Sequence, residues 1–257
     1  MLKDRIKAGE KLIGCYTEIT DPAISRIEGL CGYDYVWIDM EHTYLSYETV
    51  FTHILTLHGT STPVIVRVPK DDLTVTKKVL EMGVDGIIFP QPESAEEAAR
   101  MISYSLYPPD GVRGFGPMGA VDFGLSDATA YMKASRDTLC RFIQIEHRGA
   151  VRELDRIMEN PFIDGYIFGP NDLAASYGLP GGAFCDEISA VIRDVTRRLH
   201  EKGKYVGIAS GSYAEDVVKH WCSFGVEMIA AGADVDFLRE GALANRAVMA
   251  RLLKGEI

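Results

Sequence analysis

The sequence predicts an α/β protein that closes into a single (β/α)₈ TIM barrel, and three observations favour this fold. The chain has 257 residues, and such barrels typically have about 250. Eight short runs rich in Val, Ile, Phe or Tyr alternate with helical patterns, and several of these runs end in polar or charged residues. Because buried apolar strands that alternate with helices form a parallel sheet covered on both faces, eight such units favour closure into a barrel.

The predicted strands follow one another along the whole chain. In order they are Leu12–Glu18, Tyr35–Glu41, Pro63–Val68, Gly86–Pro90, Arg141–Glu146, Gly165–Pro170, Lys204–Ser210 and Met228–Asp234. The clearest helical patterns between and after them are Leu73–Met82 before Gly83, Ser94 to about Leu106 with a capping box at its start, Asp186–Lys202 before Gly203, and Asp236–Leu253.

One connection is longer than the others. It runs from Tyr107 to Leu139, begins with a segment rich in proline and glycine, and has a short helical pattern from about Ser126. Connections of this length usually serve a function or an interface. Because no linker, internal repeat or low-complexity tract divides the chain, we predict one domain over residues 1–257.

Composition and charge narrow the classes of partner. The formal net charge is −10 and the sequence pI is about 5.1, which disfavours nucleic acid and anionic membrane surfaces. The N-terminus lacks the apolar core of a signal peptide, and no apolar stretch approaches membrane-spanning length. The five cysteines form no C-x-x-C pair, which indicates reduced thiols. The sequence therefore predicts a cytoplasmic protein with a small-molecule substrate.

Two carboxylates lie at the ends of consecutive predicted strands. Glu146 ends the fifth run, and Asp172 lies just beyond the sixth. Functional groups at the carboxyl ends of barrel strands build the active site of this fold. Two neighbouring carboxylates repel each other unless they share a proton or a divalent cation, and oxygen ligands suit Mg²⁺ or Mn²⁺. We therefore predict a metal site there, although Asp172 could instead cap a helix.

Arg67 directly follows the third apolar run. A buried arginine is costly unless it faces an acid or an anionic ligand. It could stabilise negative charge that develops on a substrate oxygen, or it could form a salt bridge with Asp39 or Glu41. His42 closes the second run. It is a candidate general base, and a neighbouring carboxylate such as Asp39 would orient it, while a structural histidine is the alternative.

Five motifs together resemble the HpcH/HpaI aldolase family, in particular the 4-hydroxy-2-oxoheptanedioate (2,4-dihydroxyhept-2-ene-1,7-dioate) aldolases. They are Ile38-Asp39-Met40-Glu41-His42, Val66-Arg67-Val68-Pro69, Tyr107-Pro108-Pro109-Asp110-Gly111-Val112-Arg113-Gly114, Gln144-Ile145-Glu146 and Gly169-Pro170-Asn171-Asp172-Leu173. The resemblance covers nearly the whole chain in the right order. It implies a barrel of the phosphoenolpyruvate/pyruvate type, a homohexamer, and a role in aromatic compound catabolism.

The resemblance also implies an activity and a set of roles. The activity is class II, metal-dependent, reversible cleavage of 4-hydroxy-2-oxo acids to pyruvate and an aldehyde through a metal-bound pyruvate enolate. Position by position, the metal ligands are Glu146 and Asp172, which would hold Mg²⁺, Mn²⁺ or possibly Co²⁺. The pyruvate moiety is held by Gln144 and by the backbone of Asn171 and Asp172, the enolate oxygen by Arg67. His42 is the base, and its partner is Glu81, where relatives more often have aspartate, or alternatively Asp39.

Two other functions fit the same sequence less well. A CoA-thioester lyase of the citryl- or malyl-CoA type would need basic residues for the nucleotide, which the acidic composition disfavours. A non-catalytic barrel that binds a carboxylate metabolite would have no need for a base such as His42 beside a metal site.

Overall fold

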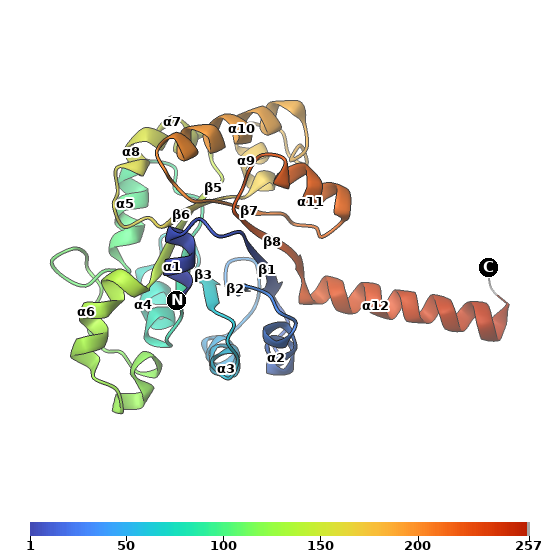
Figure 1. The fold of residues 1–257 in the computed structure, drawn as a ribbon, viewed down its shortest axis with the longest axis horizontal. Helices are drawn as coiled ribbons and strands as arrows, with labels where there is room; N and C mark the ends of the chain where they lie inside the picture. The colour runs from blue at the N-terminus through green and yellow to red at the C-terminus, as the bar shows by residue number, and fades with distance from the viewer. Residues whose placement is uncertain (256–257) are drawn as a thin grey trace.

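Eight parallel strands close into a barrel in the order β1 to β8, as the computed structural model shows for residues 1–255, the part of the chain that it describes. This confirms the predicted fold class (Figure 1). The strands are β1 Leu12–Thr17, β2 Tyr35–Asp39, β3 Val64–Arg67, β4 Gly86–Phe89, β5 Cys140–Ile145, β6 Gly165–Phe168, β7 Val206–Ala209 and β8 Met228–Ala233. Each lies at one of the eight predicted runs.

Helices follow the strands, and most of them cover the outer wall of the barrel. They are α1 Leu2–Lys7, α2 Pro22–Leu30, α3 Tyr47–His58, α4 Leu73–Glu81, α5 Ala95–Ser103, η1 Gly119–Gly124, α6 Ala128–Thr138, α7 Arg148–Arg152, α8 Leu154–Met158, α9 Pro170–Ser176, α10 Asp186–Glu201, α11 Glu215–Cys222, α12 Asp234–Met249 and η2 Ala250–Lys254. The long connection after α5 holds η1 and α6, and η1 packs against α4. Within residues 1–255, none of the helices has both the length and the apolar character needed to cross a membrane.

Strand alternation divides the core into two layers. Side chains such as Trp37 and Ile65 fill the inside of the barrel, and their sequence neighbours pack against the helices outside. The inward side chains are apolar along the strands and become charged at the carboxyl ends of β2 and β3. Two residues after Trp37 comes Asp39, and two after Ile65 comes Arg67. The same alternation that fills the core therefore places charged side chains at the mouth of the barrel.

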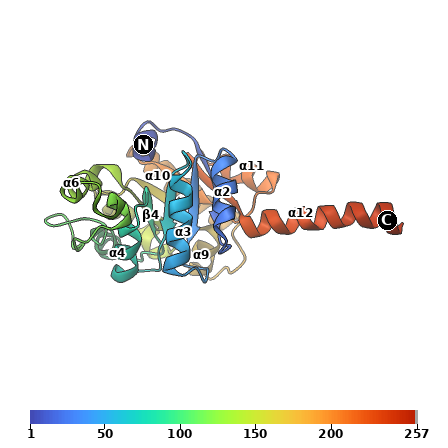
Figure 2. The ribbon, with the colours of Figure 1, turned by 90° about the horizontal axis from the view of Figure 1, so that it is seen from below.

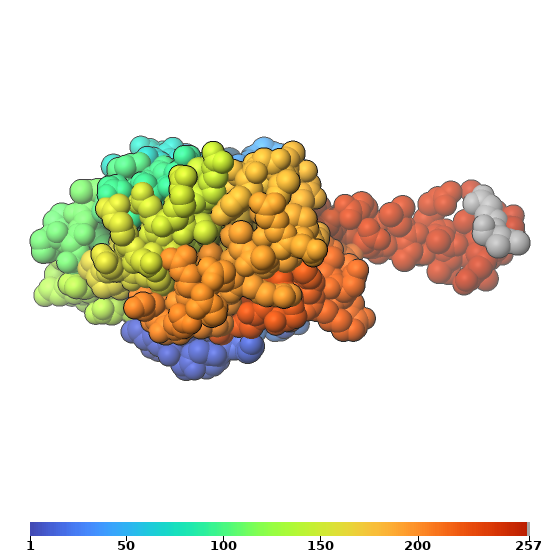
Figure 3. Space-filling model, turned by 90° about the horizontal axis from the view of Figure 1, so that it is seen from above, coloured from blue at the N-terminus to red at the C-terminus, as the bar shows by residue number. Residues whose placement is uncertain are grey.

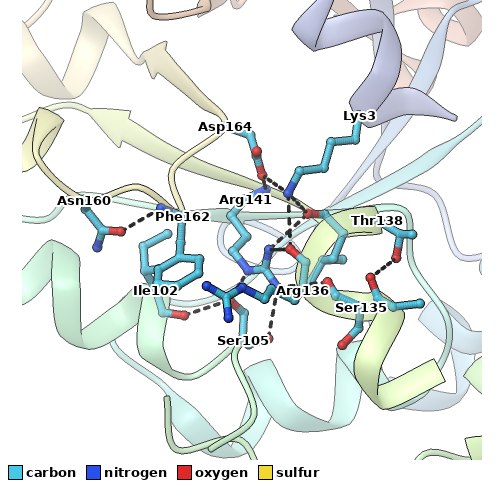
Figure 4. A network of polar contacts seen from close by, with 12 residues as sticks. Lys3, Ile102, Ser105, Ser135, Arg136, Thr138, Arg141, Asn160, Phe162 and Asp164 are labelled. Carbon is cyan, nitrogen blue, oxygen red and sulfur yellow. Dashed lines mark hydrogen bonds and ion pairs between the residues drawn. The ribbon is translucent and has the colours of Figure 1, made fainter. Parts of the chain in front are cut away.

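The amino end of the barrel is closed by α1 and by a buried polar network (Figure 4). Lys3 Nζ donates to the carbonyl oxygen of Leu139 at 3.0 Å and contacts Asp164 Oδ2 at 3.0 Å. The guanidinium of Arg141 donates to Ser105 Oγ and to backbone carbonyl oxygens. Burial lowers the pKa of Arg141 to about 10. Every nitrogen of these two cationic side chains has an acceptor, which is typical of a structural network.

The helix that follows β8 does not return to the barrel. Figures 1 and 2 show α12 as an arm that points away from the barrel, and Figure 3 shows the same projection as a surface. Apolar side chains along this arm are exposed, among them Leu238 and Leu243. On the barrel, the Ile13 side chain points outward from β1 and is 53% exposed. An outward position on a barrel strand is normally buried under a helix, so this part of the wall lacks its cover within one protomer.

Candidate active site at the carboxyl end of the barrel

The register of β2 and β3 places Asp39 directly beside Arg67. Arg67 Nε donates to Asp39 Oδ1 at 2.9 Å, and Nη2 donates to Oδ2 at 2.6 Å. Arg67 Nη1 lies 3.1 Å from Glu41 Oε2. Burial would lower the pKa of this guanidinium, but the hydrogen bonds and charge of Asp39 outweigh it and raise the pKa. Arg67 is therefore a fixed cation, and both acids that the sequence offered as salt-bridge partners contact it.

A chain of polar contacts leads from Arg67 to Glu146. Arg67 Nη1 donates to Gln144 Oε1 at 3.5 Å, and Gln144 Nε2 donates to Glu146 Oε1 at 2.7 Å. Gln144 is an inward residue of β5, and Glu146 continues the same face just past the strand end. The three side chains are buried. The structure thus brings together three of the predicted site residues.

The carboxyl group of Glu146 is deeply buried and only half satisfied. Its side-chain Oε2 has no hydrogen-bond partner among the described residues. Burial, with the nearby charges of Glu41 and Asp172, raises its pKa to about 8 although Arg67 opposes the shift. A Cβ at Gly169 would overlap with Glu146 Oε1, so only glycine leaves room for this carboxyl group. An orphaned buried carboxylate oxygen at a strand end is typical of a binding site rather than of a structural contact.

Arg67 and Glu146 line a cavity of about 380 Å³ at the mouth of the barrel. The predicted residues Asp39, His42, Arg67, Glu146, Asn171 and Asp172 all line it, together with Tyr16, Glu18, Gly169, Pro170, Ala209, Gly211, Gly232, Ala233 and Asp236. The cavity is within the size range of small-molecule sites, about 300–1,000 Å³. Asp172 lies in the first turn of α9, and no side-chain cap is formed at the start of this helix. Its carboxylate thus faces the cavity rather than capping α9.

The donor set fits a hard divalent cation. Glu146 and Asp172 present carboxylate oxygens to the same cavity, and one buried oxygen of Glu146 lacks a partner in the described chain. Oxygen ligands suit Mg²⁺ or Mn²⁺, which commonly keep further positions for water and substrate. Within residues 1–255 no group of three or more His, Cys, Asp or Glu side chains gathers as a metal cage. A site of two carboxylates with open positions is what the sequence predicts.

In the part of the chain that the structure describes, no ion pair or hydrogen bond joins His42 to Asp39 or to Glu81, its two predicted partners. Asp39 instead binds Arg67, and its Oδ1 accepts the backbone N–H of Glu41. Glu81 is the last residue of α4, a helix that runs from the carboxyl end of β3 back to the amino end of β4. It therefore lies at the opposite end of the barrel from His42. The carboxylate nearest to His42 is Glu41, whose Oε2 is 3.7 Å from His42 Nε2.

Two further acids at this site have no catalytic role of their own in the sequence prediction, where Glu41 is named only as a possible ion-pair partner. Glu41 contacts both Arg67 and His42, and burial raises its pKa, which the charge of Arg67 opposes. Glu18 lies one residue past β1 and lines the cavity. Glu18 could have been found from the sequence in the same way as Glu146, because each is a carboxylate at the end of an apolar run.

Known proteins share this fold and about three tenths of the residues. A sequence model of the HpcH/HpaI aldolase/citrate lyase family matches residues 12–240. The hydroxypyruvate/pyruvate aldolase of Roseovarius nubinhibens is 31% identical over 240 residues, 93% of each chain. The 2-keto-3-deoxy-L-rhamnonate aldolase of Escherichia coli is 30% identical over 247 residues, 96% of this chain and 91% of that protein. A crystal structure of an HpcH/HpaI aldolase/citrate lyase family protein from Burkholderia cenocepacia has a TM-score of 0.89 and 28% identity, and the match covers 96% of this chain and 98% of that one.

Proposed function

Because the chain belongs to the HpcH/HpaI aldolase/citrate lyase family of carbon–carbon lyases, we propose that it is a metal-dependent class II aldolase that reversibly cleaves 4-hydroxy-2-oxo acids to pyruvate and an aldehyde. The observation that carries this proposal is the half-satisfied, buried Glu146, which lines the cavity with Asp172 and is linked through Gln144 to Arg67. The relatives named above are aldolases of 2-oxo acids, which supports the same assignment.

Glu146 and Asp172 would hold the metal ion, which we propose to be Mg²⁺, Mn²⁺ or Co²⁺. When bound, such an ion acts as a Lewis acid that polarises the 2-oxo group and stabilises negative charge. The Arg67 guanidinium is held by Asp39 and Glu41 and lines the cavity, so its fixed positive charge can face the substrate. We assign the pyruvate moiety to Gln144 and to the backbone of Asn171 and Asp172.

In the cleavage direction His42 accepts the proton of the C4 hydroxyl group, and Glu41 supports the positive charge that the imidazole gains. The C3–C4 bond then breaks. The aldehyde leaves, and the electron pair remains on the pyruvate fragment as an enolate, whose oxygen Arg67 stabilises. Protonation at C3 gives pyruvate. A preorganised guanidinium costs no reorganisation at this step, because its ion pairs with Asp39 and Glu41 already exist.

Pyruvate release from a panel of 4-hydroxy-2-oxo acids, including 4-hydroxy-2-oxoheptanedioate, tests the proposal. The assay is run with Mg²⁺ or Mn²⁺, with EDTA, and with the Glu146→Ala and Asp172→Ala variants. We expect pyruvate only with metal and only when both acids are present. Glu159→Gln is the matched control, since Glu159 is exposed and ends α8 away from the cavity. No pyruvate from any substrate despite bound metal would contradict the proposal and favour a CoA-thioester lyase or a binding protein.

We also propose that the protein acts as a homo-oligomer, a hexamer according to its family resemblance. The exposed apolar side chains of the α12 arm, such as Leu238, and the uncovered Ile13 support this proposal. A second copy could bury both surfaces, because exposed apolar patches of this kind mark interfaces. Light scattering of the full chain gives the mass directly. A monomer at micromolar concentration would overturn the proposal, and Leu238→Glu with Leu243→Glu should lower the mass.

A further inference from the structure

We propose that Glu18 forms the aldehyde side of the cavity and selects uncharged, hydroxylated aldehydes over aldehydes that carry a carboxylate. This inference rests on the proposed aldolase function and names the class of its second substrate. It concerns the part of the cavity lined by Glu18, just after β1, and by Gly232 and Ala233 of β8. In the closed barrel β1 lies across from β5, the strand that ends just before Glu146.

Strand alternation aims Glu18 at the cavity. Gly14 and Tyr16 are inward residues of β1, and Glu18 is the next position on the same face. Its backbone is held in place by buried Asp234, whose Oδ2 accepts the N–H groups of Glu18 at 3.0 Å and of Ile19 at 2.8 Å. The loop that carries Glu18 is therefore anchored by hydrogen bonds of its backbone.

The charge of the cavity is strongly negative. Its lining carries five carboxylates and one arginine or lysine side chain; the carboxylates are Glu18, Asp39, Glu146, Asp172 and Asp236. The one cation is Arg67, which already contacts Asp39 and Glu41. A divalent ion at Glu146 and Asp172 would meet the carboxylate of pyruvate. A second substrate carboxylate would then find no unpaired cation among the described residues that line the cavity.

Glu18 is the carboxylate best placed to contact the aldehyde. Asp236 has a partner at 2.9 Å, Arg239 of α12, whereas within residues 1–255 no ion pair or side-chain hydrogen bond involves the Glu18 carboxylate. Burial, and to a lesser extent the neighbouring carboxylates Asp234 and Asp39, raise the pKa of Glu18. A hydroxyl group can donate to Glu18, while a substrate carboxylate can only be repelled.

The proposed role of Glu18 affects the binding of the aldehyde and not the chemistry of pyruvate. In the synthetic direction C3 of pyruvate loses a proton and bonds to the aldehyde carbon, and the aldehyde oxygen gains a proton to become the C4 hydroxyl group. A short hydroxyaldehyde places its other hydroxyl groups toward Glu18. The distal carboxylate of 4-hydroxy-2-oxoheptanedioate would lie toward the same acidic wall, which disfavours this dianion.

Competing aldehydes test the inference. Glyceraldehyde and succinic semialdehyde are each condensed with pyruvate in the presence of Mn²⁺, and the ratio of their kcat/KM values is measured. We expect the wild type to prefer glyceraldehyde by roughly tenfold or more, because like charges a few ångströms apart repel strongly in a partly buried site. Glu18→Gln should reduce this ratio, and Glu18→Lys should shift it further toward succinic semialdehyde. Comparing ratios between variants cancels the different intrinsic reactivity of the two aldehydes.

The matched control is Glu159→Gln, which should leave the ratio unchanged. A wild-type preference for succinic semialdehyde, or an unchanged ratio in both Glu18 variants, would overturn the inference. Should Glu18→Lys fail to fold, as judged by circular dichroism, the Glu18→Gln ratio decides. Metal-dependent exchange of the C3 protons of pyruvate with deuterium, followed by NMR without aldehyde, separates the two proposals. Absent exchange contradicts the aldolase itself, whereas normal exchange with an unchanged ratio contradicts only the role of Glu18.

Discussion

The two ends of the barrel each bury an arginine, and the two arginines have different surroundings. At the amino end, Arg141 binds Ser105 Oγ and backbone carbonyl oxygens, and no polar atom of its guanidinium is left over. At the carboxyl end, Arg67 binds acids beside a cavity, and the neighbouring Glu146 keeps an unpaired oxygen. Buried polar groups with hydrogen-bond partners stabilise a fold. Buried polar groups without partners cost stability and are retained where a ligand supplies the missing partner. The comparison distinguishes a structural network from a candidate active site.

The first prediction concerns activity, which should depend on Arg67 and not on Arg141. Arg67→Ala removes the cation that faces the enolate oxygen, and we expect kcat for pyruvate release to fall by about 10²–10³-fold. Steady-state kinetics with saturating Mn²⁺ measure the loss. Turnover close to that of the wild type would mean that Arg67 is as structural as Arg141.

The second effect separates them by stability. Arg141→Met leaves the Ser105 hydroxyl group and several buried carbonyl oxygens without their donor, so we expect the free energy of unfolding to fall by about 2–4 kcal/mol. Urea denaturation followed by circular dichroism measures this change. The folded fraction should keep the wild-type KM, since Arg141 lies at the end of the barrel away from the cavity; a raised KM would show that the two ends are coupled.

Glu28, a buried acid of α2, should make the stability of the folded chain depend on pH. Burial raises the pKa of Glu28 to about 8, although a hydrogen bond from Thr17 Oγ1 opposes the shift. The folded chain therefore holds a proton that the unfolded chain releases above its ordinary pKa of 4.5. Stability must then fall as pH rises from about 4.5 to 8. Glu28→Gln should remove this loss, so that it gains about 1–3 kcal/mol over the wild type between pH 5 and pH 8. A constant difference across that pH range would refute the assignment.

The smallest predicted effect is a change in thermal stability when Glu146 loses its charge. In metal-free protein at pH 8, Glu146→Gln removes a carboxylate that burial disfavours and keeps the oxygen that Gln144 contacts. We expect Tm in EDTA to rise by about 2–4 °C, whereas pyruvate release assayed with Mn²⁺ is lost, the exchange of stability for function that active sites show. Differential scanning calorimetry in EDTA measures the shift. A lower Tm would place Glu146 with the structural network instead.

The barrel and most of the candidate site residues are predictable from the sequence. Apolar runs ending in Asp39, Arg67 and Glu146 are visible in one dimension because buried parallel strands are continuous and because their carboxyl ends converge. Each of the eight predicted strands corresponds to an observed one. Family resemblance supplied the aldolase assignment, and the cavity contains six of the predicted site residues.

The contacts among these residues depend on how the strands and helices are arranged in space. The register between β2 and β3 pairs Asp39 with Arg67 and so takes Asp39 away from His42. The direction of α4 carries Glu81 to the far end of the barrel. Closure between β8 and β1 brings Glu18 into the cavity, although more than a hundred residues separate it from Glu146. Local sequence specifies each strand and its inward face, but contacts between strands depend on register and closure, which only the folded chain sets.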